Sequence, residues 1–76
     1  MRENRTVPFR DTNIKVSRNY YGQQYICAAD VCEIIKRTEL LKDGAILNLC
    51  PTAMKMAFRR NGREHWAIRP GDMHTI

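Results

Sequence analysis

Residues 18–35, RNYYGQQYICAADVCEII, hold the pattern that decides the fold: a glycine turn, a short apolar strand and then a helix. Gly22 lies where a chain reversal favours glycine, and the run Tyr25-Ile26-Cys27 behind it is typical of a strand. Asp30 follows as an acidic residue near the helix start, where its carboxylate meets unpaired amides and the positive end of the helix dipole. The stretch therefore predicts the return strand of a hairpin that leads directly into a helix.

The helix in this stretch is amphipathic. Val31, Ile34 and Ile35 are spaced as i, i+3 and i+4, so they share one face. Lys36 and Arg37 fall outside that stripe. We therefore expect a helix from Asp30 through Arg37, with an apolar face inward and a basic end in solvent.

The segments before the turn differ from one another. Residues 13–17, NIKVS, alternate with Ile14 and Val16 on one face, which predicts the first strand of the hairpin. Residues 1–12 are mostly polar and charged, with a proline at position 8, and we expect a loose N-terminal arm there. The domain is predicted to span residues 13–76, and because it ends on a helix start it is a candidate fragment of a longer chain.

Three segments continue the chain toward the second half. Residues 38–44, TELLKDG, predict a turn of helix capped by Thr38 and stopped by Asp43-Gly44. Residues 45–50, AILNLC, are apolar enough for a buried strand. Residues 51–58 contain both alternating apolar residues and i, i+4 pairs, so helix and strand both stay open for them.

An Asn-Gly pair at residues 61–62 predicts a second hairpin, because both residue types tolerate the positive φ of a tight turn. Trp66 and Ile68 alternate on its return strand, and Asp72-Met73-His74 begins a further helix. The predicted fold class is α+β: one small domain with two β-hairpins packed on two or three short helices. The expected core consists of Ile14, Val16, Tyr25, Ile26, Val31, Ile34, Ile35, Leu41, Ile46, Leu47, Leu49, Met54, Met56, Trp66 and Ile68.

The two hairpin regions also resemble each other. Each has a tip glycine, at position 22 or 62, followed by an aromatic return strand. An aspartate and an apolar residue follow that strand in both cases, as Asp30-Val31 and as Asp72-Met73. This likeness leads to the hypothesis of an internal repeat.

Composition places the chain in the ordinary globular class, with 43% hydrophobic and 28% charged residues. Its apolar runs are far shorter than the ~20 residues that cross a bilayer, and the N-terminus lacks a signal-peptide core. We therefore expect a cytoplasmic protein that does not enter a membrane. The odd number of cysteines, at positions 27, 32 and 50, favours buried free thiols over disulfides or a metal site.

Positive charge is concentrated in one segment. The formal net charge is +5, and residues 55–69 contain five basic side chains against one acidic. A local basic patch suits nucleic acid, because each neutralised phosphate releases condensed counterions, and a two-stranded ribbon fits a DNA groove or backbone. We therefore predict binding to double-stranded DNA. The predicted binding residues are Lys36, Arg37, Lys55, Arg59, Arg60, Arg63 and Arg69.

No sequence pattern indicates catalysis. The chain lacks a nucleophile and base at a recognisable spacing, a phosphate-cradling glycine loop and a metal-ligand motif. We therefore predict a protein that is not an enzyme and that uses no cofactor, metal ion or small-molecule substrate.

Two alternatives to duplex DNA stay open. The basic hairpin would also suit an acidic patch on a protein partner, and a second copy of the chain is a further candidate partner. Tyr20, Tyr21 and Tyr25, which lie near Arg18, raise the alternative of single-stranded nucleic acid, because exposed aromatic rings stack on bases. One of these tyrosines is expected in the core.

Two family resemblances bear on function. Residues 20–37, YYGQQYICAADVCEIIKR, resemble the Bro-N and KilA-N families of phages and large DNA viruses, in which a small hairpin leads into such a helix. Residues 61–73, NGREHWAIRPGDM, are similar to the wing and closing helix of excisionase-type and MerR-like winged helices. Both resemblances imply a DNA-binding regulator of a phage or mobile element, such as an antirepressor that acts on transcription. The residues that carry the first likeness are Tyr25, Ala28, Asp30, Val31, Cys32 and Ile35.

Overall fold

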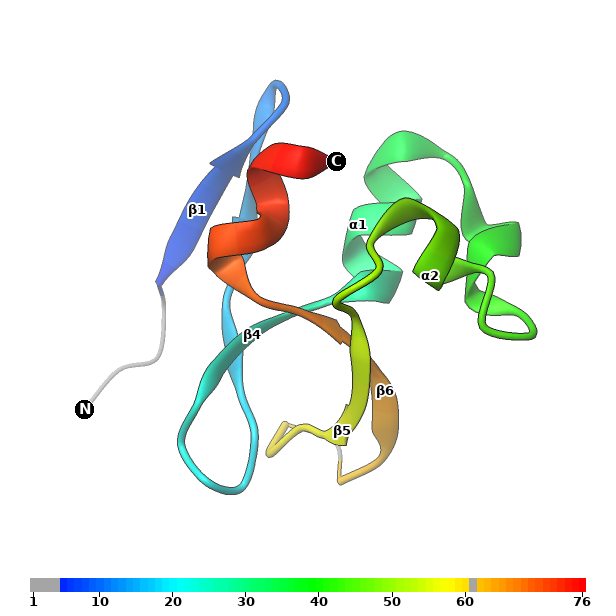
Figure 1. Cartoon of the computed structure of the whole chain (residues 1–76). Coiled ribbons are helices and arrows are strands. Elements are labelled where there is room, and N and C mark those ends of the chain that lie inside the picture. Colours follow the sequence, from blue (N-terminus) through cyan, green and yellow to red (C-terminus); the bar gives the residue numbers. More distant parts are fainter. Residues whose placement is uncertain (1–4, 61) are drawn as a thin grey trace.

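The computed structural model describes residues 5–60 and 62–76 and has the predicted α+β fold, with two antiparallel sheets and several short helices (Figure 1). Two of the helices, η1 and η2, are 3-10 helices. The elements in chain order are β1 (Thr6–Phe9), β2 (Thr12–Lys15), β3 (Ser17–Arg18), β4 (Gln24–Cys27), α1 (Ala28–Ile35), η1 (Thr38–Leu41), α2 (Ile46–Leu49), β5 (Met54–Ala57), β6 (Glu64–Ile68) and η2 (Pro70–Thr75).

The N-terminal segment forms a strand, so the loose arm predicted for residues 1–12 is wrong over its described part. β1 pairs antiparallel with β2, and Arg10 takes a positive φ in the turn between them. Pro8 fits there because an edge strand tolerates a residue without an N–H donor. Phe9 is 6% exposed, so the strand is anchored in the core. Residues 1–4 of the predicted arm lie outside the described residues.

The larger sheet has the strand order β3-β4-β6-β5, so each hairpin places its return strand at the centre. Ile26 of β4 lies opposite Ile68 of β6, and Cys27 lies opposite Ala67. A helix follows each central strand, α1 after β4 and η2 after β6. Two hairpin-and-helix units are thus joined through their return strands.

The two edge strands of this sheet also meet. Just beyond β3, Asn19 forms an isolated β-bridge with Phe58, which lies just beyond β5. Next to it, the Arg59 amide donates a hydrogen bond of 3.0 Å to the Arg18 carbonyl. The sheet therefore closes into a small ring, and the two hairpin loops come together at the bottom of the view in Figure 1.

The ring of strands has its own small core. Phe58 is completely buried, although arginines follow it in the sequence, and it clusters with Tyr25, Cys27 and Ala67. A second and larger cluster lies between the strands and the helices, where residues of β1 and β2 also contribute. Burial of a phenylalanine side chain contributes roughly 2 to 3 kcal/mol, so Phe58 strongly favours the closed sheet.

A buried asparagine supports the closure. The Asn19 side chain is in a residue only 4% exposed, and its Oδ1 accepts hydrogen bonds from the backbone amides of Tyr21 (3.0 Å) and Gln23 (2.9 Å). Its Nδ2 donates to the Gln23 side chain at 2.9 Å. An asparagine that bonds the backbone two residues ahead builds a turn, and Gly22 completes it with a φ of 81°. The buried Asn19 side chain therefore holds the backbone of the first hairpin tip through hydrogen bonds.

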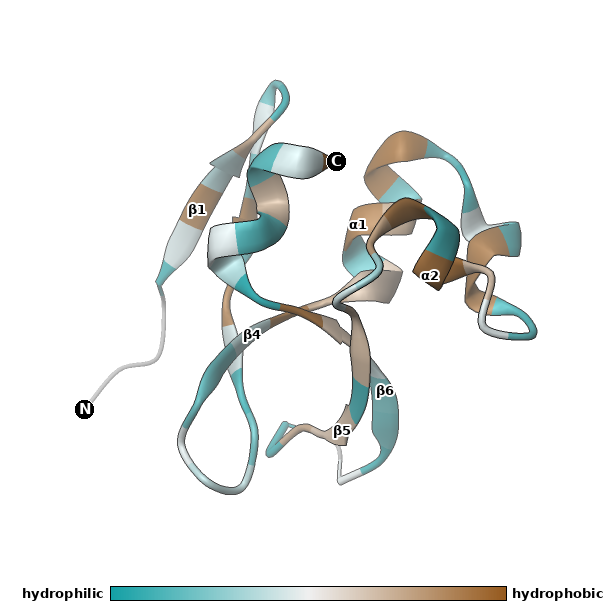
Figure 2. Ribbon diagram, in the orientation of Figure 1, coloured by the Kyte–Doolittle hydropathy of each residue, from teal (hydrophilic) through white to brown (hydrophobic). Residues whose placement is uncertain are grey.

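The predicted core is confirmed for the most part. The brown segments of Figure 2 lie on the helices and on the strands that face them. The prediction is wrong for Leu47 and Met54, which are 40% and 46% exposed. Residues 46–49 form the short helix α2 instead of the predicted buried strand, and this helix buries Ile46 while Leu47 faces solvent. Met54 is exposed because it lies on the edge strand β5. The expected residues that are only partly buried against a core are Ile34, Ile35, Leu41, Leu49, Met56 and Trp66.

Helix α1 ends earlier than predicted, at Ile35. Lys36 takes a left-handed conformation with a φ of 59°, and the Arg37 amide bonds back to the Cys32 carbonyl at 2.9 Å, which terminates the helix. Thr38 is the first residue of η1 and does not cap it. η1 ends at Leu41 with Lys42 as its C-cap, two residues before the predicted stop, while Asp43 and Gly44 both take a positive φ in the turn that leads to α2.

The second hairpin is confirmed, and the open question over residues 51–58 is resolved in favour of a strand, β5. Met54 to Ala57 pair with Ala67 to Glu64. Beyond the last strand pair, the Phe58 amide donates to the Arg63 carbonyl at 3.4 Å and the Phe58 carbonyl accepts from the Gly62 amide at 2.8 Å, so the hairpin bonding continues to Phe58. Gly62 has the expected positive φ of 69°, whereas Asn61 lies outside the described residues.

If Asn19 supports the closed sheet as described, Asn19→Ala should lower the free energy of unfolding by about 2 to 3 kcal/mol, because two amides lose their acceptor. The matched control is Asn13→Ala, at an exposed position of β2, which should change stability by less than about 0.5 kcal/mol. Urea unfolding of both variants measures the difference. Equal stabilities of the two variants would contradict the role of Asn19.

Candidate nucleic-acid interface

The arginine-rich loop, at its described residues 58–60, 62 and 63, lies against the loop of the first hairpin. The Tyr20 hydroxyl lies 3.2 Å from the position that a Cβ on Gly62 would occupy. In the opposite direction, the Arg59 guanidinium lies 3.8 Å from the corresponding position on Gly22. Each loop thus has a glycine facing a side chain of the other loop: at Gly62 the absent Cβ permits the close approach of Tyr20, whereas Arg59 lies at ordinary contact distance from Gly22. We call residues 18–23 together with residues 58–60, 62 and 63 the joined loops.

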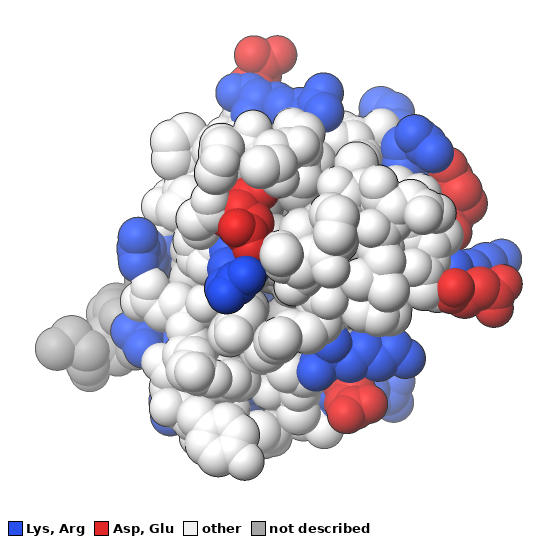
Figure 3. Space-filling model, in the orientation of Figure 1, with Lys and Arg blue, Asp and Glu red and all other residues white. Residues whose placement is uncertain are grey.

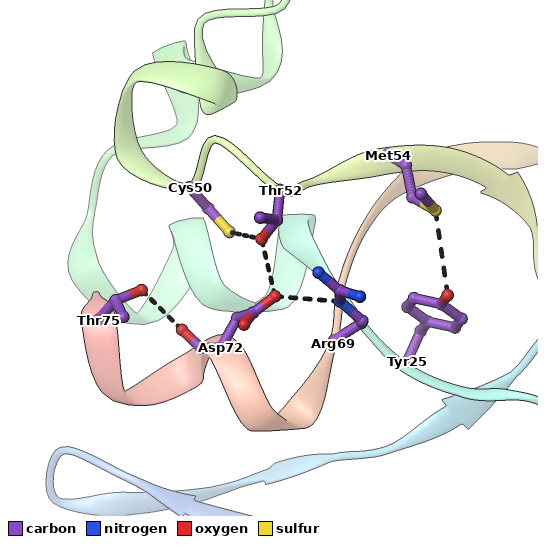
Figure 4. A network of polar contacts seen from close by, with 7 residues as sticks. All are labelled: Tyr25, Cys50, Thr52, Met54, Arg69, Asp72 and Thr75. Atoms are coloured by element: carbon purple, nitrogen blue, oxygen red, sulfur yellow. Dashed lines mark hydrogen bonds and ion pairs between the residues drawn. The ribbon is translucent and has the colours of Figure 1, made fainter.

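Two tyrosines project from the joined loops. Tyr20 is 59% exposed and Tyr21 is 88% exposed. Arg18 lies beside them, half-buried, and its guanidinium donates to the Gly22 carbonyl at 2.5 Å. The third tyrosine of the region, Tyr25, is buried as one of the three was predicted to be, and its hydroxyl faces the Met54 sulfur at 3.9 Å (Figure 4).

The three arginines of the second loop have different surroundings. Arg60 lies 3.5 Å from the Asp30 carboxylate in the first turn of α1 and stacks over the Phe58 ring. It therefore links the loop to the helix, and its charge is partly neutralised. Arg59 and Arg63 are exposed. Among the described residues, no carboxylate forms an ion pair with Arg59.

Lys55 extends the basic surface along β5. Its ammonium group lies 5.6 Å from the centre of the Trp66 ring, in cation–π geometry. A shallow pocket of about 220 Å³ opens beside these two side chains and is also lined by Glu64 and His65. His65 is half-buried, with its ring 6.3 Å from that of Phe58. Lys55 thus lies next to the joined loops but shares its surroundings with a carboxylate.

Arg69 belongs to a different network, shown in Figure 4. Its Nε donates to Oδ2 of Asp72 at 3.2 Å, and the Thr52 hydroxyl donates to the same oxygen at 2.7 Å. The hydrogen bond from Thr52, followed by that from Arg69, holds the pKa of Asp72 below its usual value. The hydrogen bond from Thr52 to Asp72 therefore connects the segment before β5 to η2, and Arg69 bonds the same carboxylate from the start of η2, away from the joined loops.

Lys36 and Arg37 follow the end of α1 that points away from the joined loops in Figure 1. Arg37 forms an ion pair with Glu39, and the hydrogen bond it donates lowers the pKa of that carboxyl. Figure 3 shows basic side chains spread over the visible face, several of them beside acidic ones. Of the predicted site, the structure gathers Arg59, Arg60 and Arg63 with Lys55 nearby, and it separates Lys36, Arg37 and Arg69.

The predicted binding residues omitted Arg18, Tyr20 and Tyr21, which the structure brings to the same surface as Arg59. Their sequence signal was present, since adjacent tyrosines at a turn beside an arginine are typical of a stacking surface. Nothing in the local sequence connects this turn with the arginines of the second loop. That connection comes from the long-range bridge between Asn19 and Phe58.

Other features of the described residues lie outside this surface. A larger pocket of about 500 Å³ lies between β1 and η2, with Val7, Phe9, Met73 and Ile76 in its lining. The cysteines at positions 27, 32 and 50 are buried free thiols, as predicted, and burial is the main cause that raises the pKa of Cys32. Across residues 5–60 and 62–76, no three His, Cys, Asp or Glu side chains gather as metal ligands would.

Within the described part of the chain, no helix has both the length and the apolar character that a membrane crossing requires. Models of known protein families, curated proteins and solved structures were compared with this chain, and none matches it. The resemblances to Bro-N, KilA-N and winged-helix proteins therefore stay predictions.

The network around Asp72 predicts a pH dependence of stability. Because the folded pKa of Asp72 lies below its unfolded value of about 3.9, this group stabilises the fold above about pH 4. The contribution is lost as the pH falls through the folded pKa. Asp72→Asn should therefore be less stable than the wild type at pH 6, with a difference that shrinks toward pH 2.5.

Urea unfolding at the two pH values measures this effect. Asp11→Asn, at an exposed position between β1 and β2, is the control for the loss of one negative charge. A stability difference between Asp72→Asn and the wild type that stays the same at both pH values would contradict the assignment.

Proposed function

We propose that the protein binds double-stranded DNA through the joined loops, with Arg59 and Arg63 on the phosphates. The observation that carries the proposal is the placement of Arg59. Its backbone is fixed by the hydrogen bond to the Arg18 carbonyl, its side chain is exposed, and it has no ion-pair partner within the described residues. An arginine whose backbone is held in this way is suited to a phosphate, because its planar guanidinium matches the oxygens and little conformational freedom is lost on binding.

The neighbouring charges support the same ligand. Arg60 and Lys55 flank Arg59 and Arg63, and the single carboxylate of this segment, Glu64, lies beside Lys55 at the pocket. Residues 55–64 thus contain four basic side chains against one acidic side chain. A polyanion relieves the repulsion among these groups and releases its own counterions.

The expected binding mode is contact with the DNA backbone. Arginines that bind phosphates position a protein on a duplex without distinguishing the bases, so affinity should depend weakly on sequence and strongly on salt. Lys36, Arg37 and Arg69 are not part of this interface in the proposal. With the family resemblances, the proposal describes a DNA-binding regulator of a phage or mobile element that acts in the cytoplasm.

The proposal predicts the effect of removing two charges at the joined loops. Arg59→Ala with Arg63→Ala should weaken binding to a random-sequence duplex and make the slope of log K against log salt concentration shallower by about 1 to 2. Fluorescence anisotropy at several salt concentrations measures both quantities.

The matched control removes the same charge elsewhere. Arg10→Ala with Lys42→Ala lowers the net charge equally, at exposed positions outside the joined loops, and should leave the slope nearly unchanged. Equal slopes for the two double variants would contradict a localised interface. Absence of duplex binding by the wild-type protein at low salt would contradict the proposal itself and favour an acidic protein partner.

A further inference from the structure

We infer that Tyr20 and Tyr21 make the joined loops a platform for unpaired bases, so that the protein prefers DNA in which a single-stranded segment adjoins the duplex. This inference rests on the proposed function, because the arginines of the same surface supply the phosphate contacts. Single-stranded nucleic acid is bound where a basic surface that follows the backbone is combined with aromatic rings that stack on bases.

The backbone of Tyr21 is held by hydrogen bonds even though its side chain is in solvent. Its backbone amide donates to the buried Oδ1 of Asn19, and the next two positions are held by the Arg18 bond to the Gly22 carbonyl and by the second bond to Asn19. A simple chain reversal needs no buried side chain to hold it, whereas this turn is held by the buried Asn19. The hydrogen bonds of this loop therefore fix the backbone that carries an aromatic ring, 88% exposed, before any ligand arrives.

Tyr20 connects the aromatic rings to the arginines. Its hydroxyl lies against Gly62 of the second loop, while Arg59 lies against Gly22 of the first. The rings and the guanidinium group therefore come from different hairpins but occupy one continuous surface. A base stacked on Tyr20 or Tyr21 would have its own phosphate close to a positive charge.

Charge distinguishes nucleic acid from a second copy of this chain as the occupant. Exposed tyrosines also occur at contacts between proteins. Two copies that met at the joined loops would bring Arg59, Arg63 and Lys55 of each copy together, and like charges in contact are unfavourable. Single-stranded nucleic acid offers phosphates to the arginines and base rings to the tyrosines.

The test separates bases from phosphates. Three labelled DNAs are compared by anisotropy: a blunt duplex, the same duplex with forked oligo-dT arms of roughly ten nucleotides, and the same fork with abasic arms. The two forks carry the same number of phosphates in their arms, and only the oligo-dT fork has bases there. The wild type should bind the oligo-dT fork more tightly than the abasic fork, which should resemble the blunt duplex.

Variants of Tyr21 assign the effect to the ring. Tyr21→Ala should weaken binding to the oligo-dT fork by roughly tenfold to a hundredfold and change binding to the blunt duplex by less than about twofold. Tyr21→Phe keeps the stacking face and should bind like the wild type. Because Tyr21 is so exposed, both variants should fold, and circular dichroism with thermal unfolding confirms this.

The possible failures are distinguishable. Equal affinity of the wild type for the two forks, or an equal loss of fork and duplex binding in Tyr21→Ala, would overturn the inference and leave duplex binding intact. Binding to none of the three DNAs would overturn the proposed function as well. A wild-type dimer in sedimentation that becomes a monomer in Tyr21→Ala would overturn the inference in favour of contact between copies.

Discussion

The arrangement of the surface depends on the contact between Asn19 and Phe58, which closes the four-stranded sheet. These residues are distant in sequence, so their pairing carries a loop-closure entropy that local turns do not. Burial of Phe58 among Tyr25, Cys27 and Ala67 offsets that cost, and Asn19 adds bonds that hold the first hairpin tip. A sheet without this closure would leave an apolar side chain in solvent and two unconnected loops.

Closure determines which charges are available to a ligand. Arg37, Arg60 and Arg69 each lie beside a carboxylate, at Glu39, Asp30 and Asp72, so their charges are partly neutralised within the protein. Arg59 is instead held by its backbone at the seam between the loops, and its side chain extends over Gly22. Only part of the positive charge in the sequence is therefore presented on one surface of the folded protein. That surface is the joined loops, where exposed tyrosines lie beside the charge.

Local patterns predicted much of the fold. The glycine turn and apolar strand before α1 and the return strand of the second hairpin follow from short-range preferences, and these were correct, whereas residues 51–58 were left open between helix and strand. Pro8 concealed β1, because a proline is compatible with a strand only at an edge, and the sequence does not identify edges. Phe58 was left out of the expected core, because its burial depends on the long-range closure of the sheet. Leu47 was wrongly included, because its direction depends on the four-residue helix α2, which tertiary packing selects. The candidate site was predicted in part, since the arginine loop was recognised while its union with Tyr20 and Tyr21 required the whole structure.

The most direct measurement of the central claim is the hydrogen exchange of the Arg59 backbone amide, followed by nuclear magnetic resonance. This amide donates to the Arg18 carbonyl across the seam. If the sheet closes, it should exchange as slowly as amides of the central strands β4 and β6, because it opens only when the ring of strands opens. Exchange as fast as that of an exposed loop amide would show that the hairpins are not joined and would contradict the account.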